Sequence, residues 1–336
     1  MAVTSPESCG LAACNAPAAP AAAATMLRAM RARLLAAFAA VYLVWGSTYL
    51  AIRFAVETLP PLLMAGVRFI IAGGILLAWA RLRGGSQGPT RRDWFTGLFG
   101  GALLLLGGNG AVVWAEQRVP SGIAALLVAV VPFWMVVLDW LRPGGRRPAT
   151  LVFVGLGLGL GGLGLLVGPS GLRAGGEIDV VGAAVLIAGS LSWAVGSLYT
   201  KASPRPSSAN NGSGTQMFAG GICLLVVALL SGEGGRLDLA HASARSLMGF
   251  AYLVTFGSLI GFTAYAYLLA HTSAAKAATY AYVNPVVAVL LGWAFANEPI
   301  TSRTLVAAAV ILAGVAIITI ARDTSSPATS ETRAAA

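Results

Sequence analysis

Ten apolar segments, each roughly 20 residues long, constrain the fold of this chain more than any other feature of its sequence. A helix of about 20 apolar residues spans the roughly 30 Å hydrocarbon core of a bilayer. The strands of an outer-membrane barrel would instead alternate apolar and polar residues in shorter runs. The sequence therefore predicts an all-α polytopic membrane protein with ten transmembrane helices. The predicted segments lie near residues 34–55, 61–81, 94–116, 120–141, 149–168, 180–200, 214–231, 246–269, 274–296 and 303–321.

The composition favours a membrane protein and excludes an ordinary soluble domain. Hydrophobic residues make up 57% of the chain and charged residues only 10%, whereas soluble domains carry about 25% charged residues. The net charge of +10 does not indicate nucleic acid as a partner, because the basic residues lie in short loops between apolar segments, where they act as topology signals in a lipid bilayer. Cys9, Cys14 and Cys223 show neither metal-ligand spacing nor a disulfide framework.

The Lys and Arg residues predict the orientation of the chain. Of the 22 in the sequence, fourteen flank the segments on one side and six on the other, while Arg68 and Lys276 lie inside segments. Because cytoplasmic loops are rich in Lys and Arg, both termini are predicted to be cytoplasmic. Residues 1–33 are predicted to form a disordered cytoplasmic tail, with Met26 as an alternative start, and residues 322–336 a second cytoplasmic tail.

The ten segments divide into two halves that resemble each other. An odd number of segments in each half predicts that the halves insert in opposite senses. This inverted-topology repeat is typical of secondary transporters, which hold their substrate near the midplane between the halves. The matched positions are Tyr42, Trp45, Tyr49 and Arg53 with Ser190, Trp193, Ser197 and Lys201, AGGILL (72–77) with AGGICLL (219–225), and Pro132 and Trp140 with Pro285 and Trp293.

Two stretches, WGSTYLAIRFAVETLPPLLMAGVRFIIAGGILL (45–77) and TSAAKAATYAYVNPVVAVLLGWAFANEPIT (272–301), resemble the drug/metabolite transporter superfamily and, within it, the EamA-domain exporters. The resemblance covers residues 34–321 and implies two inverted five-helix EamA-like repeats, 34–168 and 180–321. It also implies a bacterial inner-membrane secondary transporter that exports amino acids, related metabolites or drugs. After Trp140, however, the first half reads LRPGGRRP and lacks an acidic residue equivalent to Glu298. The matching motif residues are Trp45, Gly46, Ser47, Arg68, Pro285 and Glu298.

Polar and aromatic residues at helical spacing predict a substrate-binding cavity. Lys276, Tyr280 and Asn284 are four residues apart and share one helical face, beside Pro285. Polar groups in hydrocarbon are costly, so such a face is expected to line a cavity or contact a neighbouring helix. For each residue alone, hydrogen bonding between helices, worth about 0.6–2 kcal/mol, is the alternative. The predicted substrate-binding residues are Trp45, Tyr49, Asn109, Trp193, Ser197, Tyr265, Tyr280 and Asn284.

Further residues are expected to have structural roles. Pro132 and Pro285 interrupt backbone hydrogen bonding and are predicted hinges. The structural charges are Arg68 and Glu298. Arg68 is expected either to snorkel outward or to pair with a carboxylate such as Glu57 or Glu116, with substrate contact as the less favoured alternative. Glu298 is expected to hold the turn into the last segment. Lys276 lies near a cytoplasmic end, where its side chain can reach the interface.

The coupling of transport to an ion stays open at this stage. Proton-coupled carriers commonly use a carboxylate or histidine buried in the membrane. Here no acidic residue is predicted at mid-membrane, and His241 and His271 lie at segment ends, so facilitated diffusion or exchange is an alternative. The stretch GLGGLG (159–164) matches a dinucleotide-binding pattern, but it lies inside an apolar segment rather than between a strand and a helix. No cofactor and no metal are therefore predicted.

The predicted function is transport of a small-molecule substrate and not catalysis. The alternative is a membrane-embedded enzyme acting on a lipid-linked substrate, which would need clustered His, Asp or Glu near one interface. The predicted cavity suits neutral, zwitterionic or aromatic solutes better than strongly cationic ones. A homodimer is also an open expectation, because the glycine-rich segment 149–168 and the alanines Ala309 and Ala313 offer surfaces for close packing.

Overall fold

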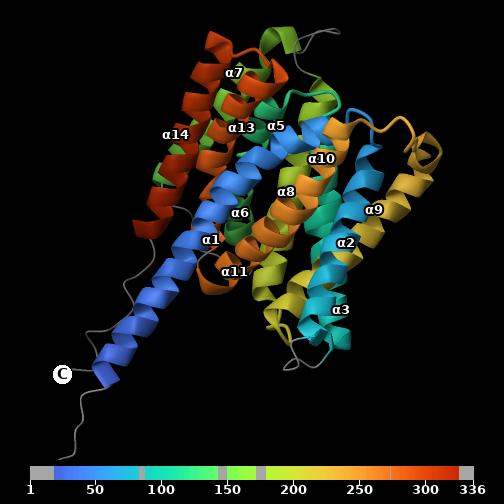
Figure 1. Ribbon diagram of the computed structural model, residues 1–336. Helices are drawn as coiled ribbons and strands as arrows, with labels where there is room; N and C mark the ends of the chain where they lie inside the picture. Colours follow the sequence, from blue (N-terminus) through green and yellow to red (C-terminus); the bar gives the residue numbers. More distant parts are fainter. Residues whose placement is uncertain (1–18, 83–87, 143–149, 172–178, 273, 325–336) are drawn as a thin grey trace, which may run out of the picture. The chain divides into compact units, whose positions relative to one another are not determined.

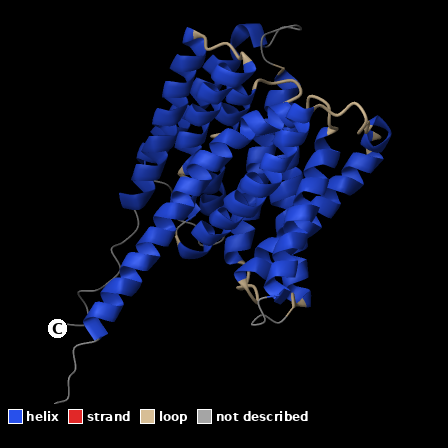
Figure 2. Ribbon diagram, viewed as in Figure 1, coloured by secondary structure: helices blue, strands red, loops and turns tan. Residues whose placement is uncertain are grey.

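The computed structural model describes residues 19–82, 88–142, 150–171, 179–272 and 274–324, and every regular element in these ranges is a helix (Figures 1 and 2). In chain order the elements are α1 (Ala19–Ala55), α2 (Pro61–Leu82), α3 (Arg91–Gly101), the π-helix η1 (Ala102–Asn109), α4 (Gly110–Ala115), α5 (Ser121–Val128), α6 (Val131–Leu141), α7 (Thr150–Gly171), α8 (Val180–Ala202), α9 (Ala209–Leu230), the 3-10 helix η2 (Glu233–Arg236), α10 (Ala244–Tyr252), the π-helix η3 (Leu253–Phe262), α11 (Thr263–His271), α12 (Ala274–Ala277), α13 (Tyr280–Ala296) and α14 (Ser302–Thr324).

Helices occupy all ten predicted segments, which confirms the all-α class. Seven of them are long and apolar enough to cross a membrane: Arg28–Ala55, Pro61–Leu82, Arg91–Ala115, Ser121–Leu141, Val180–Ala202, Ala209–Leu230 and Ala244–His271. Shorter apolar helices follow at Thr150–Gly159, Val283–Ala296 and Ser302–Gly314, inside the three remaining segments. Length and hydropathy of the described residues thus support seven spans, and ten crossings stay a prediction.

Contacts divide the chain into one unit that ends at Ala36 and another that begins at Ala37. The described part of the first unit is the N-terminal part of α1. This helix begins at Ala19, within the tail that the sequence predicted to be disordered. The local reason is composition, since Pro20 favours the first helical turn and the alanines after it have the highest helix propensity. Residues 1–18 and 325–336 lie outside the described residues.

Within the unit that begins at Ala37, equivalent helices of the two halves pack against each other. The second helices, α2 and α9, lie side by side, as do the fifth helices, α7 and α14 (Figure 1). In the fourth segments α5 packs against α13, and the first helix of the second half, α8, packs against η1 in the third segment of the first half. The first helix of the first half likewise contacts the third segment of the second half, where Ser47 of α1 hydrogen-bonds Tyr252 of α10 at 2.6 Å.

Both fourth segments are broken into two helices, although the sequence predicted each as one span. In the first half, α5 ends at Val128 and α6 begins at Val131, with Pro132 in its first turn. In the second half the break separates α12 from α13, and Pro285 lies inside α13. A proline in a first turn removes no helical hydrogen bond, whereas one inside a helix does. Their roles as hinges stay predictions.

Polar side chains explain helix starts that hydropathy misses. Helix α9 begins at Ala209, ahead of the predicted residue 214, because the Ser208 side chain accepts a hydrogen bond from Asn211 N. Asp93 and Thr90 form a capping box at α3, and the buried Asp93 carboxylate also accepts the Ser207 hydroxyl at 2.7 Å. The start of α9 is therefore polar yet buried against α3.

Glycines in α7 and α14 let these two helices approach closely. A Cβ on Gly314 would lie 2.6 Å from the carbonyl oxygen of Gly155 and 2.7 Å from the nitrogen of Gly159. Close packing by the glycine-rich segment is therefore seen at Gly155 and Gly159, and the partner is a helix of the same chain, whereas a Cβ on Gly157 or Gly161 would meet nothing within 4 Å among the described residues. Ala309 and Ala313 are exposed on α14, and the homodimer stays a prediction.

The α2–α9 contact generates a stability prediction with a neighbouring control. A Cβ on Gly73 would lie 2.6 Å from Phe218 N and 2.8 Å from Gly214 O, whereas one on Gly74 would meet nothing within 4 Å. We expect Gly73→Ala to destabilise the protein by about 1–3 kcal/mol through overpacking. Gly74→Ala should be neutral or stabilising by up to about 1 kcal/mol, because alanine favours the helix. Thermal unfolding in detergent measures both, and equal effects would contradict the packing described.

Candidate functional site

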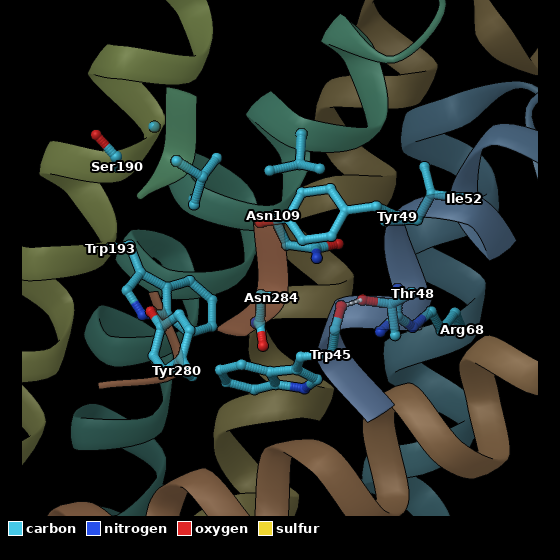
Figure 3. A pocket seen from close by; sticks show the side chains of 14 residues that line it. Trp45, Thr48, Tyr49, Ile52, Arg68, Asn109, Ser190, Trp193, Tyr280 and Asn284 are labelled. Atoms are coloured by element: carbon cyan, nitrogen blue, oxygen red, sulfur yellow. Dashed lines mark hydrogen bonds between the residues drawn. The ribbon is translucent and has the colours of Figure 1, made fainter. Parts of the chain in front are cut away.

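A pocket lies among helices of both halves (Figure 3). Its walls come from α1, α2, η1, α4 and α5 of the first half and from α8 and α13 of the second. The lining residues are Trp45, Thr48, Tyr49, Ile52, Arg68, Gly108, Asn109, Val112, Val128, Gly189, Ser190, Trp193, Tyr280 and Asn284.

Two tryptophans from the first helix of each half meet in this pocket. The ring centroids of Trp45 and Trp193 are 5.4 Å apart, with the rings at 82°, an edge-to-face contact favoured by aromatic quadrupoles. Each indole lies against a glycine of the other half. A Cβ on Gly108 would lie 2.7 Å from Trp193 Cε3, and one on Gly261 would overlap the Trp45 indole. Gly108 lies in η1 and Gly261 in η3, the π-helices of the two third segments. The two halves therefore make matching contacts.

Two tyrosines complete the aromatic wall. Tyr280 lines the pocket, and its ring centroid is 5.3 Å from that of Trp45. Tyr265 is buried behind the wall, with its ring 5.0 Å from Trp45 and 5.5 Å from Trp193. Its hydroxyl forms a 2.7 Å hydrogen bond with Ser197, which also donates to Trp193 O. Ser197 and Tyr265 therefore support the wall from behind and do not line the pocket.

Two carboxamides face the pocket from opposite halves. Asn109 ends η1, and Asn284 lies on α13, one turn after Tyr280 (Figure 3). The Oδ1 atoms of both side chains are buried and have no hydrogen-bond partner among the residues that the structure describes. A buried polar atom without a partner costs about 1–3 kcal/mol. Since both atoms belong to pocket-lining residues, a donor on a bound solute would satisfy them.

Arg68 brings a positive charge to the pocket. The residue is 3% exposed, its Nε donates to Ser258 Oγ at 2.7 Å, and its guanidinium lies 4.6 Å from the centroid of the Phe69 ring. Its Nη1 has no hydrogen-bond partner in the described part of the chain. Figure 3 shows the side chain reaching from α2 toward Thr48.

The ion pairs expected for Arg68 with Glu57 or Glu116 are absent from the described part of the chain. Glu57 pairs instead with Arg245, at 3.5 Å. Glu116 lies at the end of α4, where Arg53 Nη1 donates to its backbone carbonyl at 3.0 Å. In the folded chain, Glu57 thus has Arg245 as its neighbouring cation and Glu116 has Arg53.

Glu298 connects the halves at the start of α5. Its Oε1 accepts from Ser121 N at 2.7 Å and its Oε2 from Gly122 N at 3.1 Å. A carboxylate at a helix N-terminus is favoured by the unpaired N–H groups there. At the turn into the last helix, Asn297 ends α13 with a φ of 53°, and the Glu298 carboxylate that follows contacts the first half. The role of Glu298 at this turn stays a prediction.

Glu116 is a buried acid near this connection. Its side chain is fully buried, and neither carboxylate oxygen has a hydrogen-bond partner. Burial, and then the charge of Glu298, raise the pKa of Glu116 well above its usual range, while Arg53 acts in the opposite direction. A carboxyl group in these surroundings favours its protonated form.

Six of the eight predicted substrate-binding residues line the pocket: Trp45, Tyr49, Asn109, Trp193, Tyr280 and Asn284. The prediction omitted Thr48 and Ser190, although helical spacing from Trp45 and Trp193 was a usable signal. It named Arg68 only as a structural charge. Lys276 is exposed at the end of α12.

The fold and this pocket define a helical membrane protein of two related halves around a central cavity. The model of the EamA-like transporter family matches residues 32–168 and again residues 180–320, and the chain belongs to this family. It is 41% identical over 292 residues to the uncharacterized inner membrane transporter YedA of Escherichia coli (strain K12), covering 86% of this chain and 91% of that protein.

More distant proteins also match this chain. The uncharacterized transporter YvbV of Bacillus subtilis (strain 168) is 25% identical over 289 residues, covering 86% of this chain and 91% of that one. A solved structure, described as a crystal structure of a protein, matches with a TM-score of 0.60 at 21% identity, covering 88% of this chain and 99% of that one. At this identity the match shows the fold alone.

The burial of Glu116 predicts a pH-dependent stability. Because the pKa is raised in the folded state, ionisation destabilises the fold, and stability falls as the pH rises from the ordinary carboxyl range through the raised pKa. We expect Glu116→Gln to unfold at a higher temperature than the wild type at about pH 8, by a few °C, with a smaller gain at about pH 5.

The matched control for this prediction is Glu57→Gln, a substitution at a half-exposed carboxylate. It should shift the unfolding temperature little at either pH, because exposed ion pairs contribute about 0–1 kcal/mol. An unfolding temperature of Glu116→Gln below that of the wild type at both pH values would show that the ionised carboxylate stabilises the fold.

Proposed function

We propose that the protein is a secondary transporter that exports small organic metabolites, either amino acids and related compounds or drugs, by alternating access. The observation that carries this proposal is a central pocket lined by both halves of a two-repeat chain. In transporters built this way, substrate lies between the repeats, and one repeat moves against the other around it. The relatives named as transporters support the proposal.

Matching contacts support an exchange between two related states. Trp45 on Gly261 and Trp193 on Gly108 are equivalent contacts made by opposite halves. If the halves are inverted repeats, exchanging their conformations would move the opening from one membrane face to the other. We propose that Pro132 and Pro285 act as hinges in this exchange, that both termini are cytoplasmic, and that the membrane is the bacterial inner membrane.

The alternative, an enzyme that acts on a lipid-linked substrate, finds no support in the site. The described residues contain no group of three or more His, Cys, Asp or Glu side chains placed to hold a metal ion. No acid or histidine is among the residues that line the pocket. The wall offers amides, hydroxyls, aromatic rings and one guanidinium, groups that suit binding better than acid–base catalysis.

Removing pocket side chains should reduce transport without preventing membrane insertion. We expect Asn284→Ala and Trp193→Ala each to lower flux about tenfold, the effect of losing ~1.4 kcal/mol of binding. The matched control is Trp293→Ala, since Trp293 is 59% exposed on the same helix as Asn284. The measurement is uptake into proteoliposomes from a panel of amino acids and cationic drugs.

Two outcomes would contradict the proposal in different ways. Wild-type flux in both pocket variants would mean that substrate does not use this pocket. Absence of flux for the whole panel, together with turnover of a lipid-linked compound, would favour the enzyme.

A further inference from the structure

We propose that the substrate is a small carboxylic acid with a flat apolar body, and that its carboxylate pairs with Arg68. This inference rests on the proposed function, because it assigns the substrate class of the same pocket. The sequence pointed to neutral, zwitterionic or aromatic solutes, and it placed Arg68 in a structural ion pair. The structure leaves this guanidinium on the pocket wall without a carboxylate partner among the described residues.

The state of Arg68 is unusual for a charge buried in a membrane protein. Such charges normally pair with an opposite charge or mark the path of a substrate or ion. The guanidinium has five N–H donors and no acceptor, yet Ser258 accepts only from Nε, and Nη1 has no partner. Phe69 offers the face of its ring but no negative charge. Among the described residues, Arg68 therefore lines the pocket without a neighbouring negative charge.

A carboxylate suits the guanidinium of Arg68 better than a neutral group does. The planar guanidinium donates two parallel hydrogen bonds to a carboxylate, and these bonds are roughly twice as strong as neutral ones. Ser258 holds the Nε end and thereby fixes the plane in which the remaining donors lie. Thr48, which also lines the pocket, lies beside the guanidinium (Figure 3). The side chain is thus oriented before a ligand arrives, which reduces the entropy lost on binding.

The aromatic wall adjoins the charge and indicates the rest of the ligand. Trp45 Nε1 donates to Gly257 O at 3.2 Å, and a Cβ on Gly257 would lie 2.8 Å from Arg68 Nη2. The Trp45 indole therefore links the surroundings of Arg68 to Trp193 and Tyr280, whose rings are 5.4 and 5.3 Å from it. A flat apolar body attached to the carboxylate would contact these rings.

The other polar groups of the pocket narrow the class of ligand further. The unpartnered Oδ1 atoms of Asn109 and Asn284 are acceptors for a hydroxyl, amide or ammonium donor on the ligand. Chloride or phosphate alone would leave the aromatic wall and both amides without contact.

The test compares a carboxylate probe with its neutral isostere. Phenylacetate and phenylacetamide are titrated by calorimetry into purified full-length protein, in the wild type, Arg68→Met, Arg68→Lys and Arg245→Gln. Arg245 is the matched control, because this arginine is partly exposed and pairs with Glu57. We expect the wild type and Arg245→Gln to bind phenylacetate about tenfold or more tightly than phenylacetamide. This preference should vanish in Arg68→Met and be partly retained in Arg68→Lys.

A second readout separates ligand binding from a structural role for Arg68. If the Arg68 guanidinium is unpaired until a ligand binds, replacing Arg68 with methionine removes an unpaired buried charge. The unfolding temperature of ligand-free Arg68→Met should then equal or exceed that of the wild type. A lower unfolding temperature would show that Arg68 holds the fold together and would overturn the assignment.

The outcomes also separate this inference from the proposed function. An undiminished preference in Arg68→Met, or binding of chloride or phosphate but of neither aromatic probe, overturns the carboxylate assignment. If proteoliposomes carry neutral solutes through the pocket and the wild type shows no preference for phenylacetate, the transport function is supported and the carboxylate substrate class is wrong. If neither probe binds and no solute is carried, both the proposed function and the carboxylate assignment are contradicted.

Discussion

The contact between Trp45 and Trp193 is the interaction on which the rest of the site depends. The first helices of the two halves meet there, and each indole needs the space left by a missing side chain in the other half, at Gly261 and Gly108. Close backbone approach is possible only where no Cβ intervenes. Because both contacts have the same form, the halves meet through equivalent surfaces. The pocket is the space that remains around this pair.

Polar groups in the pocket lower the stability of the fold but can bind a ligand. Arg68, Asn109 and Asn284 each hold a buried atom without a hydrogen-bond partner. A chain selected for stability alone would replace such groups with apolar side chains, which are often neutral or stabilising in place of buried charges. Their presence around one pocket is therefore best explained by a ligand that supplies hydrogen-bond partners. The same reasoning sets them apart from Ser197 and Tyr265, which satisfy each other behind the wall.

Much of the site was predictable, because helical spacing in the sequence already places residues on one face. Trp45 and Tyr49 lie on such a face, and both line the pocket. Spacing along one helix does not report which neighbour a side chain meets in another. Ser197 was therefore predicted to contact substrate, but it lies behind the pocket and bonds Tyr265. Arg68 was expected to pair with a carboxylate such as Glu57, which pairs with Arg245 in the folded chain.

The sequence by itself determined the helical membrane class and the two-repeat organisation, because both depend on local composition and on repeated spacing along one chain. Only the tertiary structure showed that the third segments contain π-helices, that the fourth segments are broken, and that Glu298 binds the start of α5. It also decided that Arg68 lines the pocket without a carboxylate partner among the described residues. These features arise from contacts between segments far apart in sequence, and no local pattern specifies which distant groups will meet.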